Sequence, residues 1–390
     1  MTALSDLCVL DLSQHVAGPF CTKLFADFGA DVIKVEPPGQ GDTARTLGPF
    51  PDGEPNLDAS GVFLYLNTNK RSITLNLETS LGRDLLRDLV MQADIVVENF
   101  NVGTMVAMGL DFDTLETLRP GVILTSITPF GQTGPWRQFQ ATDLITHATS
   151  GLSAVNRAPD GPPLREPGHQ TDYQGGAFAF VSTMSAVCYR DIERVGQHVD
   201  IAIQEAAATM IAPAITRVAY AGRSPGMRLG FLPCKDGYIT LNVRSDQAWR
   251  DLWSFFGHPE GAEDERLLTV SDRRYKQTEM EAYIKPQLAK FTMSEIFDAL
   301  QPKRILVGMA LAIPNLLDNP HLKARELFVE TEHPTAGPLV FPGAPFKMSV
   351  TPWQLRRPAP LLGQHNDEVY IERLGYTRSD LDRWQADGVI

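Results

Sequence analysis

One carboxylate is set apart by the sequence around it. Asp172 ends a loop rich in Pro and Gly, residues 161–172, and apolar residues then recur at three- and four-residue spacing over 177–188. That spacing predicts a helix, which Gly196 would stop. An aspartate at the entrance of a helix usually caps it, because its oxygen accepts hydrogen bonds from the free N–H groups of the first turn. The cap is the simplest use of Asp172, and the rest of the chain decides whether this carboxylate also does chemistry.

Several other reactive arrangements are absent from the sequence. Gly39-Gln-Gly41 is followed by Asp-Thr-Ala, so it does not complete G-x-G-x-x-G, and no G-x-x-x-x-G-K-[ST] occurs. Ser153 lies in a segment without the final glycine of a nucleophile elbow. The eight histidines include no H-x-x-x-H pair and the four cysteines no C-x-x-C, so no metal site is expected. Carboxylates and glycine-rich loops remain as the candidate groups.

The elements before this loop alternate as in a doubly wound α/β domain. Strands are predicted at residues 8–12, 31–35, 72–77, 95–97 and 122–127. Ala17-Gly-Pro19 predicts a turn, and helical spacing follows at 22–28 and 85–90. Such alternation requires parallel strands with right-handed crossovers, and ligands then bind at the carboxyl ends of the strands. The loops after Leu12, Val35, Val97 and Ile127 are therefore where a binding site is expected.

The rest of the chain is expected to form a second domain and a returning arm. Gly- and Pro-rich punctuation at 222–238 precedes a predicted strand at 238–243 and helical segments rich in Trp and Leu. From Pro334 the chain is Pro-rich and lacks long periodicity until 366–388. We therefore expect a large domain over 1–220, a small domain over 221–332, and an arm over 333–390 that returns to the large domain.

Composition excludes several classes of protein. The 390 residues are 43% hydrophobic and 21% charged, with a formal net charge of −12. This balance supports a sizeable core and argues against nucleic acid or an anionic membrane surface as the main partner. No apolar stretch reaches 18 residues, no secretory leader is recognisable, and the cysteines lie far apart. A cytoplasmic protein in a reducing compartment is expected.

A series of loop motifs follows in a fixed order along the chain. The motifs are Leu12-Ser-Gln-His-Val-Ala-Gly-Pro19, Asp27-Phe-Gly-Ala-Asp-Val-Ile-Lys-Val-Glu-Pro37, Gly41-Asp42 with Arg45, Asn69-Lys-Arg-Ser-Ile73, Ala93-Asp-Ile-Val-Val-Glu-Asn-Phe100, Phe130-Gly-Gln-Thr-Gly-Pro135, Asp143, Ser150-Gly151, Asp160-Gly-Pro-Pro163, Asp172, Gly196-Gln-His-Val-Asp200, Leu362-Gly-Gln-His-Asn366 and Gly388-Val-Ile390. In this order and spacing the chain resembles the family III CoA-transferases, also called the CaiB/BaiF family. The likeness runs nearly from end to end.

The resemblance implies a fold and a mechanism. It implies a Rossmann-like large domain built from both chain ends, a smaller α/β domain, and a homodimer of two interlocked chains. It also implies that CoA passes from an acyl-CoA to a carboxylic acid through a nucleophilic aspartate, which falls on Asp172. A carboxylate is ionised at neutral pH and needs no adjacent base. Backbone N–H groups near Gly175-Gly176 are expected to bind the oxyanions that form. Acyl-CoA is then a substrate, and no tightly bound cofactor is expected.

The resemblance implies further that CoA is contacted from the loops after the early strands. The contact residues are Gln14, Ala17, Arg45, Lys70, Arg71, Leu75, Asn99, Phe100 and Met108. Leu75 and Met108 equally fit a hydrophobic core. Lys70 and Arg71, offered for the phosphates, equally fit a solvated surface pair.

The sequence departs from formyl-CoA transferase at positions used there against CoA. These positions hold Val16, Pro37, Glu78, Ala107 and Gln140 here. Either the contacts are only partly kept, or Arg45 or Arg137 compensates at the phosphates. The glycine-rich loop over the oxalate-type site also lacks a counterpart, so oxalate is not expected as acceptor. Loop arginines for a dicarboxylate acceptor are Arg157, Arg165, Arg223 and Arg228.

Two alternatives within the same fold stay open. An α-methylacyl-CoA racemase exchanges an α-proton and needs an acid and a base on opposite faces of the carbon. The racemase branch has His before the residue matching Asp143, where this chain has Thr142; His147 is the replacement in view, although a structural histidine on a helix is the better interpretation of it. His169 is expected to be loop scaffolding. A non-catalytic CoA-binding subunit would have lost Asp172, which this chain keeps.

Overall fold

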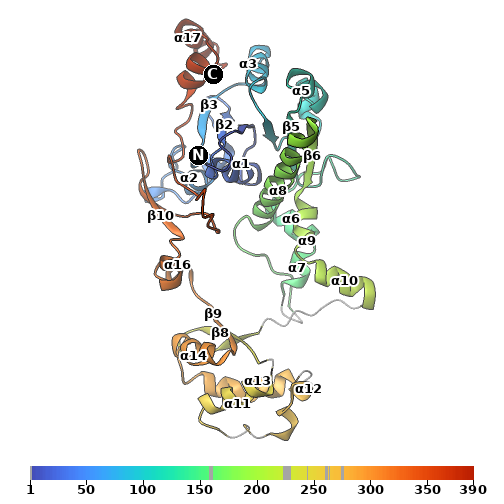
Figure 1. Ribbon diagram of the computed structural model, residues 1–390, viewed down its shortest axis with the longest axis vertical. Helices are drawn as coiled ribbons and strands as arrows, with labels where there is room; N and C mark the ends of the chain where they lie inside the picture. The colour runs from blue at the N-terminus through green and yellow to red at the C-terminus, as the bar shows by residue number, and fades with distance from the viewer. Residues whose placement is uncertain are drawn as a thin grey trace. The chain divides into compact units, whose positions relative to one another are not determined.

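The protein divides into two compact units. The computed structural model describes residues 2–157, 161–222, 230–243, 245–259, 262, 264–273 and 276–390. One unit comprises Met1–Gly226 together with Glu326–Ile390, and the other comprises Met227–Arg325 (Figure 1). Both chain ends therefore belong to the same unit.

A six-stranded parallel sheet forms the centre of the first unit. Its strands are β1 (Cys8–Asp11), β2 (Asp31–Glu36), β3 (Arg71–Thr74), β4 (Ile95–Glu98), β5 (Ile123–Thr128) and β6 (Gln197–Ala202). They lie in the order β3-β2-β1-β4-β5-β6, and each neighbouring pair is parallel. This is the strand order of the dinucleotide-binding fold, in which the direction of winding reverses between β1 and β4. The predicted α/β class and the five predicted strands are confirmed; β6 was not predicted.

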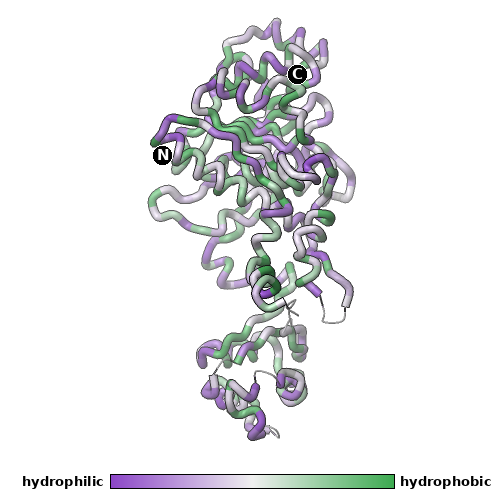
Figure 2. The backbone as a smooth tube through the Cα atoms, turned by 90° about the vertical axis from the view of Figure 1, so that its right-hand side faces the viewer, coloured by the Kyte–Doolittle hydropathy of each residue, from purple (hydrophilic) through white to green (hydrophobic). Residues whose placement is uncertain are grey.

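Apolar side chains of the strands point to both faces of the sheet, and each face packs against a layer of helices. Val9 belongs to a core shared with α1 and α8, whereas Leu10 belongs to a second core shared with α3 and α17. Successive strand residues point to opposite faces, so helices cover both sides of the sheet. Figure 2 shows these hydrophobic strands at the centre of the unit. The helices of this unit are α1 (Ala17–Asp27), α2 (Gly61–Leu66), α3 (Ser80–Val90), α4 (Thr104–Ala107), α5 (Phe112–Leu118), α6 (Asp143–Thr149), α7 (Leu152–Val155), α8 (Gln170–Glu193), α9 (Ile203–Thr209), α10 (Ala212–Ala221) and α17 (Arg378–Ala386).

The turn predicted at Ala17-Gly-Pro19 is wrong, because α1 already begins at Ala17. Pro19 fits the first helical turn, where its missing N–H would lack an intrahelical partner anyway. Gly18 is required by packing: a Cβ there would lie 2.2 Å from the Ser13 side chain. Turn-forming residues thus serve the first turn of a helix here.

The segment from Glu326 onward lies against the edge of the sheet at β3. It begins with an unpredicted antiparallel hairpin of β10 (Phe328–His333) and β11 (Gly337–Pro342). His365 N–H donates to Ser72 O at 2.9 Å, and Asn76 N–H donates to Val389 O at 2.7 Å. These bonds fix a π-helical segment, Asp367–Arg373, and α17 beside β3.

The second unit has its own core. Its antiparallel sheet comprises β7 (Phe231–Pro233), β8 (Tyr238–Asn242) and β9 (Leu306–Met309). Trp249 and Trp253 are buried in this core, with ring centroids 5.2 Å apart. Its helices are α11 (Asp246–Phe255), α12 (Val270–Arg273), α13 (Gln277–Leu288), α14 (Met293–Leu300), α15 (Ile313–Leu317) and α16 (Pro320–Ala324). Across the described residues of both units, no helix has the length and apolar character needed to cross a membrane.

Candidate active site

The loops that follow β1 and β4 are tied together where the winding of the sheet reverses. The Asn99 side chain accepts a hydrogen bond from Gln14 N–H at 2.8 Å and donates one to Gln14 O at 2.7 Å. In open α/β sheets the crevice at this point is the usual ligand site. The two predicted loops therefore form the floor of a shared binding region.

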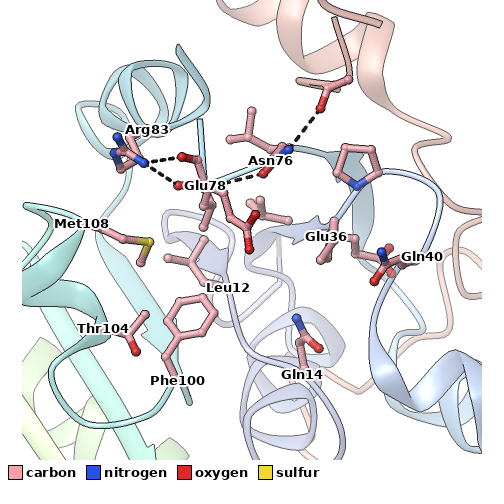
Figure 3. Close-up of a pocket in the computed structure, with 16 residues that line it drawn as sticks. Leu12, Gln14, Glu36, Gln40, Asn76, Glu78, Arg83, Phe100, Thr104 and Met108 are labelled. Atoms are coloured by element: carbon pink, nitrogen blue, oxygen red, sulfur yellow. Dashed lines mark hydrogen bonds between the residues drawn. The ribbon is translucent and has the colours of Figure 1, made fainter. Parts of the chain in front are cut away.

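A pocket of about 680 Å³ opens on one side of this region. Four of the predicted CoA contacts line it: Gln14, Leu75, Phe100 and Met108. Figure 3 shows Leu12, Phe100 and Met108 forming an apolar wall, with polar side chains around it. Arg83, which the sequence analysis did not single out, is the one basic side chain among the described residues that line this pocket. Its guanidinium donates to Leu77 O and Glu78 O.

A smaller pocket of about 190 Å³ contains Asp172. Ala17, Asn99 and Phe100 line it as well, so it brings three predicted CoA contacts to the predicted nucleophile. Phe100 lines both pockets. The two cavities are thus neighbours that share an aromatic side chain.

Asp172 does not cap the helix that carries it. Helix α8 begins at Gln170, which makes Asp172 the third helical residue, and this residue is only 6% exposed. The carboxylate that satisfies the helix start is Asp143, whose Oδ1 accepts from Thr171 N–H at 2.9 Å and from Thr171 Oγ1 at 2.8 Å. The cap interpretation of Asp172 is therefore wrong, and its carboxylate stays available to the pocket.

Two histidines that sequence reasoning did not connect with Asp172 lie beside it. His169 Nδ1 is 3.2 Å from Asp172 Oδ2, and His15 Nε2 is 3.8 Å from the same oxygen. The hydrogen bond to Asp172 is the main cause that raises the pKa of His169 above its usual 6.5, with burial opposing it. The signal for His15 in the sequence was its place in the loop after Leu12, where a binding site was expected. His169 was expected to support the loop only, and its contact with the Asp172 carboxylate was not predicted.

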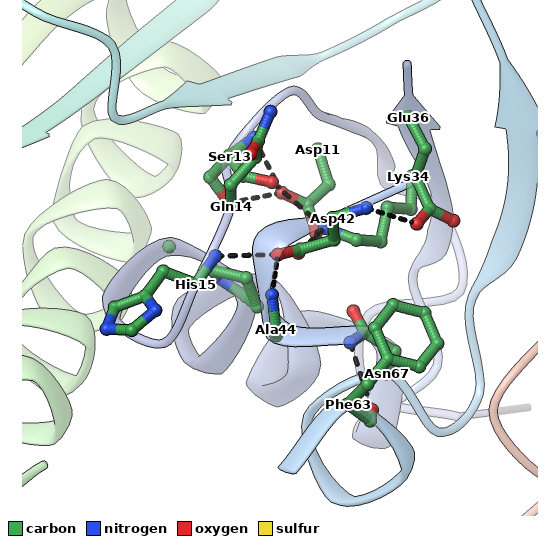
Figure 4. A network of polar contacts seen from close by, with 12 residues as sticks. Asp11, Ser13, Gln14, His15, Lys34, Glu36, Asp42, Ala44, Phe63 and Asn67 are labelled. Carbon is green, nitrogen blue, oxygen red and sulfur yellow. Dashed lines mark hydrogen bonds and ion pairs between the residues drawn. The ribbon is translucent and has the colours of Figure 1, made fainter. Parts of the chain in front are cut away.

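His15 is positioned by a buried charge network (Figure 4). The backbone N–H of His15 donates to Asp42 Oδ1 at 2.8 Å, and Asp42 Oδ2 is 2.7 Å from Lys34 Nζ. Lys70, with no exposed surface, donates to Asp11 Oδ2 at 2.9 Å and to three other oxygens. Nearby Lys34 and Lys70 hold the pKa of Asp11 below its usual range against the opposing effect of burial. A contact between Lys70 and a phosphate would require this network to break.

The other two predicted cations are also engaged elsewhere. Arg45 is fully buried and binds both oxygens of Glu36, at 2.6 and 2.9 Å. Arg71 donates to Glu368 at 2.7 Å and pairs with Asp31. Neither side chain lines either pocket.

The residues considered for α-proton exchange in a racemase make structural hydrogen bonds and ion pairs instead. His147 has no exposed surface, and its Nδ1 lies 2.7 Å from Ser153 Oγ. Asp143 pairs with Arg165 at 3.1 Å besides capping α8. Arg157 is exposed, whereas Asp160, Arg223 and Arg228 lie outside the described residues.

The predicted oxyanion donors at Gly175 and Gly176 are wrong. Both residues lie in the second turn of α8, where N–H groups bond to carbonyls one turn earlier. Their role is close packing: a Cβ on Gly176 would lie 2.4 Å from Ala17 O, and one on Gly175 would lie 2.9 Å from Ile203 Cγ1. Only glycines allow α8 to approach α1 and α9 this closely.

One group of residues has the composition and spacing of a metal site. Within the described part of the chain, single donor atoms of His15, His169 and Asp172 lie within 4.8 Å of one another. Two imidazoles and a carboxylate are ligands that suit zinc. The group coincides with the predicted nucleophile, so a metal and an acyl donor would compete for it.

Comparisons with known proteins give a consistent result. Residues 4–366 match the model of CoA-transferase family III. A succinate–glutarate CoA-transferase of Agrobacterium fabrum is 34% identical, covering 95% of each chain. A succinyl-CoA–D-citramalate CoA-transferase of Chloroflexus aurantiacus is 33% identical, over 99% of this chain and 98% of the relative. The crystal structure of a CaiB/BaiF family protein from Brucella suis has a TM-score of 0.86 and 29% identity, over 95% of this chain and 99% of that one.

Proposed function

The chain belongs to CoA-transferase family III, an enzyme family that moves CoA between acids, and we propose that it does so through covalent intermediates on Asp172. The observation that carries this proposal is the Asp172 carboxylate in a small pocket directly beside a larger one. An acyl-CoA matches this arrangement of pockets, because its long CoA body and its compact acyl group are joined at the reactive carbonyl carbon.

In the proposed cycle the Asp172 carboxylate attacks the thioester carbonyl. A mixed anhydride forms and CoA leaves as a thiolate. The thiolate then attacks the aspartyl carbonyl, which releases the donor acid and leaves an aspartyl-CoA thioester. The acceptor acid reverses these two steps, so one difficult exchange becomes a series of easier ones.

The larger pocket is proposed to hold the CoA body. Its apolar wall with a few polar groups suits the pantetheine arm and the adenine ring. We assign a phosphate to Arg83 rather than to Arg45, Lys70 or Arg71, because Arg83 lines the pocket, is only partly buried, and among the described residues bonds to backbone carbonyls rather than to a carboxylate. Arg83→Ala is expected to raise the KM for acyl-CoA with little change in kcat.

The acceptor is proposed to be a dicarboxylic acid. Arg137 is exposed and lines the pocket of Asp172, where its guanidinium is available to a second carboxylate. The names of two relatives include succinate, glutarate and citramalate, which are dicarboxylates. The unpaired state of all four cysteines supports the cytoplasm as the location.

The decisive test is to trap the acylated residue. The protein is incubated with succinyl-CoA or acetyl-CoA, quenched with hydroxylamine or borohydride, and mapped by mass spectrometry. Asp172 is expected to carry the modification. Asp172→Asn is expected to lower CoA exchange by several orders of magnitude, as losing a nucleophile does. Asp191→Asn, an exposed acid on the same helix, is the control and keeps wild-type activity. Modification at another residue, or an active Asp172→Asn, contradicts the proposal.

Racemisation of 2-methylacyl-CoA remains the second candidate, because two histidines beside Asp172 offer acid–base groups. It is less favoured, since Asp143 and His147 are both held in structural bonds. Washout of α-deuterium from 2-methylacyl-CoA without movement of CoA between acids would decide for it.

A further inference from the structure

The two histidines beside Asp172 contact one of its oxygens. The hydrogen bond of His169 Nδ1 and the approach of His15 Nε2 are both directed at Oδ2, at 3.2 and 3.8 Å. Among the described residues, no hydrogen bond reaches Oδ1. The carboxylate therefore has a held oxygen and a free one, and the free oxygen is the one able to attack.

The backbone of His15 and the contact between the two rings place both imidazoles beside Oδ2. His15 has a positive φ of 72°, a conformation that costs energy for a residue other than glycine and tends to persist where function requires it. The bond from its N–H to buried Asp42 holds this conformation. His169 ends the loop before α8, and its ring meets the ring of His15 edge to face, with centroids 5.0 Å apart. The pair is thus preorganised around Oδ2.

We propose that His15 and His169 form the oxyanion-binding site for the reactions that take place at the Asp172 carbonyl carbon. The inference rests on the proposed function and assigns a role that the N–H groups of Gly175 and Gly176, inside α8, do not fill. It makes the two histidines catalytic residues for the steps in which Asp172 is the group attacked.

The chemistry follows from which oxygen is held. Oδ1 attacks the donor carbonyl and becomes the bridging oxygen of the anhydride, while Oδ2 becomes the aspartyl carbonyl oxygen. When the CoA thiolate attacks Cγ, the carbonyl electron pair moves onto Oδ2. Collapse of this oxyanion re-forms the carbonyl and breaks the Cγ–Oδ1 bond, so the donor acid leaves as a carboxylate that carries Oδ1. No proton is gained or lost in the step.

The discharge by the acceptor uses the same oxygen. A carboxylate oxygen of the acceptor attacks Cγ of aspartyl-CoA, negative charge again develops on Oδ2, and CoA leaves as a thiolate. Attack of that thiolate on the acceptor carbonyl then returns the bridging oxygen to Asp172 as Oδ1. The two steps at Cγ use the histidine pair, whereas the two steps at the substrate carbonyl place their charge elsewhere.

The histidines favour the transition states over the intermediates. Oδ2 shares one charge with Oδ1 in the carboxylate, is nearly neutral in the anhydride or thioester, and carries a full charge in the tetrahedral oxyanion. Donors aimed at an atom whose charge grows during reaction stabilise the transition state selectively. Shortening the His15 contact from 3.8 Å by roughly 0.7 Å would bring it to oxyanion-hole distance.

The test separates the steps by rapid quenching and intact-protein mass spectrometry. Wild type, His15→Ala and His169→Ala are mixed with succinyl-CoA, and the anhydride and the aspartyl-CoA adduct are followed in time. Labelled succinate is then added to measure discharge of aspartyl-CoA. Each variant is expected to form the anhydride at the wild-type rate but to convert it, and to discharge aspartyl-CoA, about 10²-fold more slowly. The anhydride, barely populated in wild type, accumulates.

Conservative variants and a control distinguish a hydrogen-bonding role of the two histidines from a purely structural one. His15→Gln and His169→Asn retain an N–H near the position of the contacting ring nitrogen, so they are expected to recover most of the lost rate. His321→Ala, at an exposed histidine of the other unit, leaves every step unchanged. Equal adduct conversion in wild type and the Ala variants, or slowing of anhydride formation alone, would overturn the role of the histidines. If wild type forms no adduct on Asp172 with succinyl-CoA or acetyl-CoA, the proposed function itself fails.

Discussion

At the scale of single residues, the neighbours of a charged side chain decide whether it is available for chemistry. Lys70 is a buried cation whose ammonium is bound by Asp11 and further oxygens, so it serves the frame of the site. Asp172 is also buried, yet one of its oxygens stays free. Burial alone does not distinguish structure from function, but the count of satisfied hydrogen bonds does.

Glu98 supports the site and is predicted to make stability depend on pH. Its Oε2 accepts from Phe100 N–H at 2.7 Å, and Phe100 lines both pockets. Burial raises the pKa of Glu98 from 4.5 to about 7, with hydrogen bonds from Ser126 and Phe100 opposing the rise. The folded protein therefore holds this proton more tightly than the unfolded chain. The resulting stabilisation is complete below pH 4.5 and is lost as pH rises through about 7.

Glu98→Gln keeps an acceptor for Phe100 N–H and cannot ionise. Relative to wild type, this variant is expected to gain up to about 3 kcal/mol of unfolding free energy between pH 4.5 and pH 8. Urea denaturation of both proteins across this range measures the difference. A difference between the two that does not change with pH would contradict the raised pKa.

At the scale of elements, the site depends on how closely α1 and α8 approach. Helix α1 follows the loop that carries His15, and α8 carries Asp172. Gly176 allows the contact because its missing Cβ leaves room for Ala17 O. The distance between the two helices thus sets the distance between His15 and Asp172.

Gly176→Ala is predicted to destabilise the protein and impair the site. The added Cβ would meet a backbone carbonyl at 2.4 Å, which cannot move aside as a flexible side chain does. We expect a loss of about 1–3 kcal/mol of unfolding free energy together with reduced exchange activity. Gly230→Ala, where a Cβ meets nothing within 4 Å, is the matched control. Equal stability of the two variants, measured by urea denaturation, would show that α1 and α8 can separate without cost.

At the scale of the whole molecule, exposed apolar side chains support the homodimer that the family resemblance implies. Helix α10 buries none of its residues, and Tyr220 on it is 92% exposed. Ile192, near the end of α8, is 76% exposed. Exposed large apolar side chains on a helix that buries none of its residues, as on α10, are typical of a surface that a partner covers.

We predict that the protein is a homodimer in solution. Light scattering is expected to give twice the chain mass of 43.0 kDa. Because folding and association would then be coupled, the midpoint of urea unfolding is expected to rise with protein concentration. A mass of one chain, with a midpoint independent of concentration, would exclude the dimer and the interlocked arrangement with it.

The sequence by itself determined the strands of the sheet, the loops that form the binding region, and Asp172 as the carboxylate to examine. The strands and the loops follow from local periodicity and from the rule that ligands gather at the carboxyl ends of parallel strands, whereas the role expected of Asp172 came from the family resemblance. It could not determine that β6 completes the sheet, since only pairing with β5 defines that strand. Nor could it assign the cap of α8 to Asp143, which comes from a separate helix.

Tertiary structure alone decided which charged groups are free. Lys70 and Arg45 were predicted to contact CoA, but both are buried and bound by Asp11 on β1 and Glu36 on β2. His15 approaches Asp172 only because α1 packs on α8 and because Asp42 holds its backbone. Contacts between residues far apart in the chain depend on the three-dimensional packing of whole elements, and no local pattern encodes them.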